Sequence, residues 1–157
     1  MKPGAHLSAN MGTNDRSMAK DVRTPVFSLI LKPGSLTNIR IHDVKVLRLG
    51  KNDGLWEFYV FRDVDAPSVL TAPNFAPKSD HVECDFDATG IDVSGGTLLS
   101  SGYYSGANDN SVTIEGDDIN TVFANNIVGV SDLFVMAYTA IGGADNILIS
   151  SSWREYF

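Results

Sequence analysis

Residues 80–105 read DHVECDFDATGIDVSGGTLLSSGYYS, and this stretch decides the fold class. Two runs in which apolar residues alternate with polar ones lie on either side of the pair Gly95-Gly96. Alternation with a period of two is typical of a strand with one buried face, and paired glycines mark a turn. The stretch therefore predicts two strands that pair across this turn.

The rest of the chain repeats this pattern. Short apolar runs recur about every ten residues, with loops rich in Gly, Pro, Asn and Asp between them, and no run has the spacing of an amphipathic helix. The pattern predicts an all-β chain whose residues 25–157 form an antiparallel β-sandwich, jelly-roll-like in type. Residues 1–24 are polar and lack periodicity, so we expect an extended N-terminal arm that is flexible or ordered by a partner.

Residues 39–63 allow finer predictions. In IRIHDVKVLRL, residues 39–49, the apolar alternation breaks at His42-Asp43 and resumes in the opposite phase. One extra residue in a strand has this effect, so a β-bulge is predicted there. The loop 50–54 ends in Asp-Gly and predicts a hairpin with the strand 55–63. In that second strand the core phase is either Trp56, Phe58 and Val60 or the residues between them.

The end of the chain predicts another hairpin. An apolar strand at 131–141 is followed by a loop with Gly142-Gly143 and by the alternating run ILISSSWREYF at 147–157. Because side chains repeat every two residues along a strand, one face of the last strand gathers four residues. These are Ile147, Ile149, Ser151 and Trp153.

Charge is distributed unevenly along the 157 residues. The net charge is −7, but residues 1–51 sum to +6 and the remainder to −13. An acidic body repels phosphate, which argues against nucleic acid as a partner. The basic part could dock on an acidic surface of a neighbouring copy, or it could be ordinary solvated charge. If it docks, the candidate assembly residues are Arg16, Lys20, Arg23 and Lys32.

Catalytic and metal motifs are weak. Residues 85–89, DFDAT, match the DxDxT pattern of haloacid-dehalogenase-like phosphatases, but that fold needs a parallel sheet covered by helices, so we expect Asp85 and Asp87 to face solvent. The acidic loops at 63–65, 108–110, 117–118 and 145–146 offer oxygen ligands for calcium, but Asp and Asn also favour turns for backbone reasons. Cys84 is predicted to be a buried strand residue. We expect no enzyme activity, no metal and no cofactor.

The composition also bears on membrane association and on sugar binding. No apolar run reaches the length of a membrane helix, and the first residues lack the apolar core of a secretory signal, so no membrane partner is expected. Exposed Trp56, Tyr103 or Tyr104 could form a sugar-binding site, although aromatic residues more commonly pack in a core or an interface.

Three stretches resemble a family of small β-domains found in virion proteins of tailed phages. They are LWEFYVFRDVDAPSVLTAPNF (55–75), VECDFDATGIDVSGGTLLSSGYY (82–104) and GVSDLFVMAYTAIGGADNILISSSWREYF (129–157). The second stretch is similar to a family core with the elements V-E-x-D, A-T, S-G-G-T and S-G-Y, and the third to a closing hairpin that ends in Trp, then Arg or Gln, then Glu. The resemblance covers about residues 39–157 and leaves the arm outside.

The resemblance implies a bacteriophage virion structural protein, located in the virion. It suggests first a capsid decoration or cement subunit that assembles as an oligomer through its β-body and N-terminal arm. Its partners would be major capsid or tail proteins and copies of itself. A tail, baseplate or fibre component is the alternative in the same class, and a carbohydrate- or host-binding module is the alternative outside it.

Overall fold

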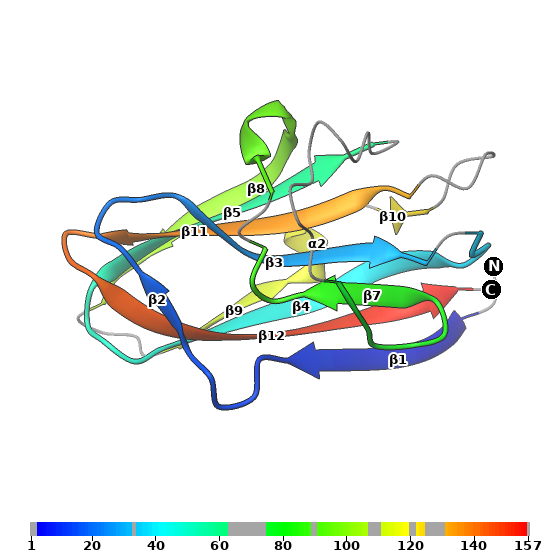
Figure 1. Ribbon diagram of the computed structural model, residues 1–157, viewed down its shortest axis with the longest axis horizontal. Coiled ribbons are helices and arrows are strands. Elements are labelled where there is room, and N and C mark those ends of the chain that lie inside the picture. Colours follow the sequence, from blue (N-terminus) through cyan, green and yellow to red (C-terminus); the bar gives the residue numbers. More distant parts are fainter. Residues whose placement is uncertain are drawn as a thin grey trace.

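The computed structural model describes residues 3–32, 34–62, 75–88, 91–106, 111–119, 122–124 and 131–156. In these ranges the chain is an antiparallel β-sandwich of two six-stranded sheets, here called sheet A and sheet B (Figure 1). The predicted fold class is therefore confirmed.

Sheet A has the strand order β1-β12-β4-β10, with β2 also pairing with β12 and β9 with β4. Its strands are β1 (Pro3–Asn10), β2 (Arg16–Met18), β4 (Asn38–Arg48), β9 (Ser111–Glu115), β10 (Val122–Phe123) and β12 (Asp145–Tyr156).

Sheet B has the order β6-β7-β3-β11-β5-β8. Its strands are β3 (Thr24–Leu31), β5 (Asp53–Phe61), β6 (Ala76–Pro77), β7 (Val82–Asp85), β8 (Thr97–Tyr104) and β11 (Leu133–Ile141). A 3-10 turn, η1 (Val93–Gly95), precedes β8, and one helical turn, α2 (Gly116–Ile119), follows β9.

Consecutive strands cross between the sheets, so the three predicted hairpins are wrong as pairings. The chain passes from β3 in sheet B to β4 in sheet A and back to β5, and it passes from β11 in sheet B to β12 in sheet A. The strands β7 and β8 share sheet B, but β3, β11 and β5 lie between them. A turn sequence sets where the chain reverses, and it contains no information on whether the next strand pairs alongside or joins the facing sheet.

The predicted bulge in β4 is confirmed. Asp43 is the partner of Ser152 on β12, and Ile41 is the partner of the next residue, Trp153, so His42 is the extra residue. The bulge keeps Ile39 and Ile41 before it, and Val44 and Val46 after it, in the core. It also turns Arg48 inward, with 2% of its surface exposed.

The main core lies between the two sheets. The predicted inward face of β12 is confirmed, because Ile147, Ile149, Ser151 and Trp153 are all buried. Across from it, Phe134 of β11 stacks on Phe58 of β5 with ring centroids 5.3 Å apart.

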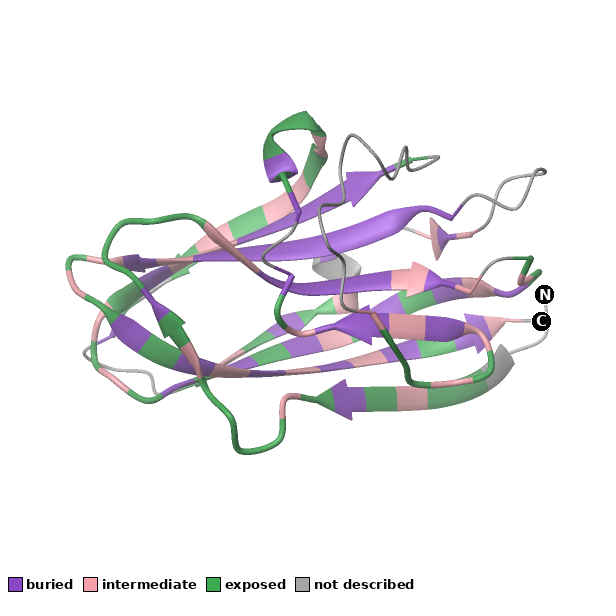
Figure 2. Cartoon of the chain, viewed as in Figure 1, coloured by how far each residue is buried: buried purple, intermediate pink, exposed green. Residues whose placement is uncertain are grey.

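A second core covers the outer side of sheet B. Leu133, Val135 and Ala137 of β11 pack there with Tyr59 and Phe61 of β5, under a segment that contributes Ala88, Ile91 and Val93. From Glu57 to Phe61, β5 is therefore buried on both of its faces, and β11 is buried along most of its length (Figure 2). Gly96 lets η1 approach closely, since a Cβ there would lie 2.8 Å from Phe61 Cζ.

The N-terminal segment lies on sheet A of its own chain. The strand β1 pairs with β12 from Ser150 to Tyr156, and β2 pairs with β12 from Asp145 to Ile147, so together they line one edge of β12. Ala9 and Met18 are buried, with 7% and 1% exposed. The segment predicted to be an arm thus forms two strands here, and its exchange onto a partner stays a prediction.

Candidate functional site

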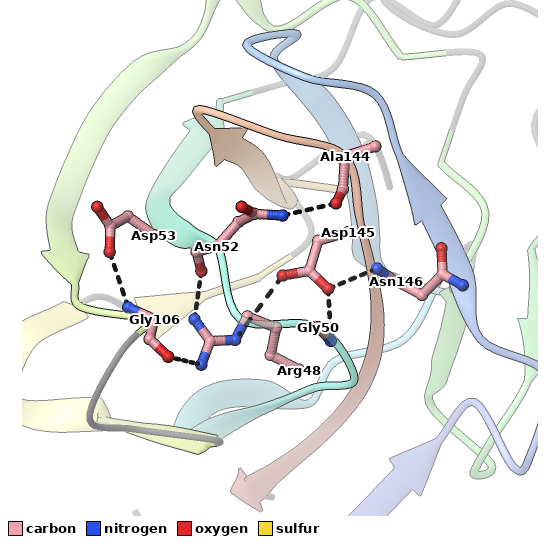
Figure 3. A network of polar contacts seen from close by, with 8 residues as sticks. All are labelled: Arg48, Gly50, Asn52, Asp53, Gly106, Ala144, Asp145 and Asn146. Carbon is pink, nitrogen blue, oxygen red and sulfur yellow. Dashed lines mark hydrogen bonds and ion pairs between the residues drawn. The ribbon is translucent and has the colours of Figure 1, made fainter.

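A buried polar cluster joins three loops at one end of the sandwich, and we call it the loop clamp (Figure 3). Arg48, at the end of β4, donates to the carbonyl oxygen of Asn52 and, at 2.8 Å, to that of Gly106. Its Nε lies 3.8 Å from Oδ2 of Asp145, and both side chains are fully buried, with 0% and 1% exposed. Asp145 Oδ1 accepts hydrogen bonds from the backbone N–H of Gly50 at 2.7 Å.

The loop clamp has a structural role. A charge that is removed from water needs an opposite charge and hydrogen bonds around it, and the guanidinium of Arg48 receives both. Asp145, one of the acidic loop residues considered for calcium, uses its carboxylate on Arg48 and on backbone N–H groups, including that of Asn146 at 2.8 Å. The clamp connects the β4–β5 loop and the β11–β12 loop to Gly106, which follows β8.

The other metal candidates do not assemble in the described part of the chain. Residues 63–65 and 108–110 lie outside it, and so do the side chains of Asp117 and Asp118. Among the residues that are described, no group of three or more His, Cys, Asp or Glu side chains is placed to hold a metal ion. None of the helices in this part is long and apolar enough to cross a membrane.

The DxDxT segment is built differently from a phosphatase site. Asp85 is buried, with 4% of its surface exposed, and its Oδ1 accepts the backbone N–H of Asp87 at 2.8 Å. The expectation that it faces solvent is wrong, because Asp85 is buried in β7 and its carboxylate is used on the backbone of the following turn, whereas Asp87 is exposed as expected. The strand β7, on which Asp85 lies, is antiparallel to its neighbours β3 and β6. Thr89 lies outside the described residues.

The cysteine is placed as predicted. Cys84 is buried in β7, with 1% of its surface exposed. Burial raises the pKa of its thiol from 9.0 to about 12, so the thiol stays protonated and unreactive at neutral pH.

Two of the four candidate assembly residues are engaged within the chain. Arg16 pairs with Asp87 at 3.0 Å and also donates to the carbonyl oxygen of that residue. Arg23 donates through Nε to Glu57 Oε1 at 2.9 Å, although 52% of its side chain is exposed. Both arginines thus tie the N-terminal segment to its own body.

The two candidate lysines lie elsewhere. Lys20 is exposed, and its backbone forms an isolated bridge with Ala140 of β11. Lys32 is half-buried, and its backbone N–H donates to the carbonyl oxygen of His81 at 2.9 Å. The role of the four candidates in assembly stays a prediction.

The aromatic residues proposed for sugar binding are separated by the sheet. Trp56 lies opposite Gly102, and Leu55 opposite Tyr103, on the paired strands β5 and β8. Adjacent residues of a strand point to opposite faces, so Trp56 and Tyr103 cannot form one platform. Trp56 packs against the main core, and Tyr103 is 75% exposed on the other side. The side chain of Tyr104 is outside the described part.

A polar groove of about 490 Å³ opens on the outer face of sheet A. Three adjacent strands form it: β1, β12 and β4. His6 and His42 stand edge to face at its margin, with ring centroids 4.8 Å apart, and Ser152 donates to Asp43 Oδ1 at 2.8 Å. The lining residues also include Ser8, Asn10, Lys45 and Ser150.

Two arginines continue this face beyond the groove. On the paired strands, His6 lies opposite Arg154, and Arg154 lies opposite Arg40. All three residues are exposed. Sequence analysis missed the row because its members are far apart in the chain. The signal that could have found it is the polar phase of the alternating strands β4 and β12.

Comparisons with known proteins give little. No protein-family model matches the chain, and no curated protein does. Among solved structures, the chain is similar to one described as the structure of infectious bursal disease virus Gt strain, with 7% identity, a TM-score of 0.26, and coverage of 99% of this chain and 30% of that one. It is also similar to a crystal structure of the T13 viral particle of the same virus, with 11% identity, a TM-score of 0.26, and coverage of 100% and 40%. The chain spans less than half the length of either matched protein, and TM-scores of 0.26 do not establish a shared fold or role.

Proposed function

We propose that this chain is a structural subunit of a tailed-phage virion, in the first place a capsid decoration or cement subunit, and not an enzyme. The proposal rests on the resemblance of residues 39–157 to phage virion β-domains and on the way the N-terminal segment is held. Within the same class, a position in the tail, baseplate or fibre would use the same body.

The observation that carries the proposal is the place of residues 3–18 on the edge of β12. The segment is held by backbone pairing and by a small number of buried side chains, chiefly Met18. In the described part of the chain β1 is the last strand of its sheet, so its outer edge has no partner strand. A neighbour's segment could make the same pairing with β12 at no loss of contacts, which is the basis of strand exchange between subunits.

The rival classes have less support. A sugar-binding module needs an aromatic platform, but Trp56 and Tyr103 point to opposite sides of sheet B. A phosphatase needs an accessible nucleophile, but Asp85 is buried in an antiparallel strand. The polar face of sheet A and the outer edge of β1 are better suited to contact with another protein.

The deciding experiment is quantitative mass spectrometry of purified phage particles, with peptide amounts scaled to the major capsid protein. Copy numbers close to that of the major capsid protein would support a decoration subunit. A small fraction of that number would move the chain to the tail, collar or baseplate. Absence from the particles would overturn the virion proposal.

Strand exchange has its own test. Ser8 of β1 and Ser152 of β12 are paired, so cysteines at these two positions face each other. With Cys84→Ser as background, chains with Ser8→Cys are unfolded and refolded together with chains with Ser152→Cys. Exchange predicts disulfide-linked heterodimers under oxidising conditions, and each variant alone serves as the control. A double variant with both cysteines in one chain should form the disulfide within that chain. If it does, and the mixture of the two single variants still forms no heterodimers, strand exchange is contradicted.

A further inference from the structure

We propose that Arg40 and Arg154, on the outer face of sheet A, form the contact surface for carboxylates of a second copy of this chain. The inference rests on the proposed assembly function and names a surface and a partner for it. The surface is distinct from Arg16, Lys20, Arg23 and Lys32, whose role in assembly stays a separate prediction.

The two arginines are held side by side by the sheet. Arg154 on β12 and Arg40 on β4 are directly opposite each other, and His6 on β1 completes the row on the same side. The strand backbones fix their spacing, so both guanidinium groups are presented to solvent from a rigid platform. An arginine fork matches the geometry of a carboxylate, and two adjacent forks can bind one or two of them.

The row lacks a local counter-charge. Among the described residues neither Arg40 nor Arg154 has an ion pair or hydrogen bond through its side chain, whereas Arg16, Arg23 and Arg62 each pair with a carboxylate. Glu155, next to Arg154 in the chain, is buried on the other face of the strand. On the face of the two arginines, the acidic residues in the strand register are Asp43, which accepts a hydrogen bond from Ser152, and its partner Glu115 on β9. Like charges directly opposite each other destabilise an antiparallel pair, and an acidic partner would remove this cost.

A second copy supplies the complementary charge. The chain has a net charge of −7, and this face is an exception to it. Asp92 lies on the other side of the sandwich, next to the turn η1 that packs on sheet B, and it is exposed. Hydrogen bonding from Ser94 lowers the pKa of Asp92, so this carboxylate is charged at neutral pH. Asp80, in the turn before β7, is exposed as well.

The geometry thus favours a head-to-tail contact. The basic row lies on sheet A and Asp92 lies on the side of sheet B, so the two surfaces belong to opposite layers of one subunit. A contact between unlike surfaces is heterologous, and it closes into a ring or continues through a shell. Such a contact between exposed charges is screened by salt.

Sedimentation equilibrium over a range of protein and salt concentrations tests the proposal. We expect the wild-type chain to self-associate at low salt and to dissociate as salt rises. The double variant Arg40→Glu with Arg154→Glu should raise the dissociation constant about tenfold or more. The control, Lys51→Glu, makes the same kind of charge change at an exposed position outside both surfaces and should have little effect.

A charge exchange sharpens the test. Chains with Arg40→Glu and Arg154→Glu, mixed with chains with Asp80→Lys and Asp92→Lys, should associate with each other more strongly than either does alone. A wild-type chain that stays monomeric at every concentration, or a double arginine variant that associates as the wild type does, would overturn the proposed contact. Presence of the chain in particles is measured independently, so either result leaves the virion proposal to its own test.

Discussion

Sheet A and sheet B have the same number of strands but differ in how many of their faces are buried. Sheet B has the main core on one side and the second core on the other, and Leu133 to Ala137 of β11 are almost inaccessible. Sheet A has a core on one side and presents polar and basic side chains on the other, with Lys45 and Arg154 as examples. Sheet B is therefore a framework, and sheet A is the layer that can contact a partner.

The largest expected effect comes from the inner face of sheet A, where a charge is buried. Asp145→Ala leaves the guanidinium of Arg48 buried without its carboxylate and should lower the free energy of unfolding by about 3–5 kcal/mol. Urea denaturation followed by tryptophan fluorescence measures this loss. Asp53→Ala is the matched control in the same clamp: its carboxylate is exposed and accepts one N–H, so about 1 kcal/mol is expected. If Asp145→Ala and Asp53→Ala lower the free energy of unfolding equally, the Arg48–Asp145 pair does not have the special role assigned to it.

The next effect concerns the edge of sheet A. Met18 of β2 is 1% exposed, so Met18→Ala should cost about 2–5 kcal/mol of stability if the segment belongs to the body. Among residues 5–10, whose burial the structure describes, Ala9 is the one buried residue, so deletion of residues 1–10 should leave the sandwich folded. If Met18→Ala leaves the denaturation midpoint unchanged, residues 1–24 are the detached arm that the sequence predicted.

A matched pair of substitutions tests the comparison between the sheets directly. Val135→Ser, on the outer side of sheet B, places a hydroxyl in the second core and should cost about 2 kcal/mol. Leu47→Ser, on the outer side of sheet A, changes a side chain that is 42% exposed and should shift stability by no more than about 0.5 kcal/mol. Thermal and urea denaturation of both variants measure the difference, and similar losses would mean that sheet A is also covered.

The smallest effect at neutral pH belongs to Cys84. Its pKa is higher in the folded chain than the ordinary value of 9.0, so the protonated thiol stabilises the fold fully below pH 9.0. That contribution is lost as the pH rises toward about 12, with a slope of up to about 1.4 kcal/mol per pH unit for one proton. Cys84→Ala should make the free energy of unfolding depend less steeply on pH in this range. Burial also raises the pKa of Tyr59 to about 12, so Tyr59 should account for the pH dependence that remains. If the pH dependence of the free energy of unfolding is the same in Cys84→Ala as in the wild type, the Cys84 thiol is exposed to water and the prediction is contradicted.

The sequence predicts the features that depend on neighbouring residues. Alternation with a period of two identifies the strands and the inward face of β12, and the phase change at His42 predicts the bulge, because both are local properties of the backbone. The same phase change places Arg48 inward and Leu49 outward. The burial of Arg48 was not predicted, because an apolar residue such as Leu49 is expected to face the core.

The features that the sequence does not predict depend on distant partners. The second core brings Val93 of η1 and Val135 of β11 into one cluster, and no local pattern connects these two positions. The partners of Arg16 and Arg23 are Asp87 and Glu57, which lie in other strands or loops. The basic row is likewise a product of strand order, since Arg40 and Arg154 become neighbours only when β12 lies beside β4.

The position of the last two strands has a consequence for folding during synthesis. The strand β11 lies between β3 and β5 in sheet B, and β12 lies between β1 and β4 in sheet A, so both sheets contain, between earlier strands, one of the two strands that are synthesised after all the other described strands. Until residues 131–156 emerge, β3, β4 and β5 have unpaired edges, and such edges promote aggregation. Before these strands are made, the chain can form flanking strand pairs such as β3–β7, β5–β8 and β4–β9, and the two sheets are completed in a late step dominated by long-range contacts.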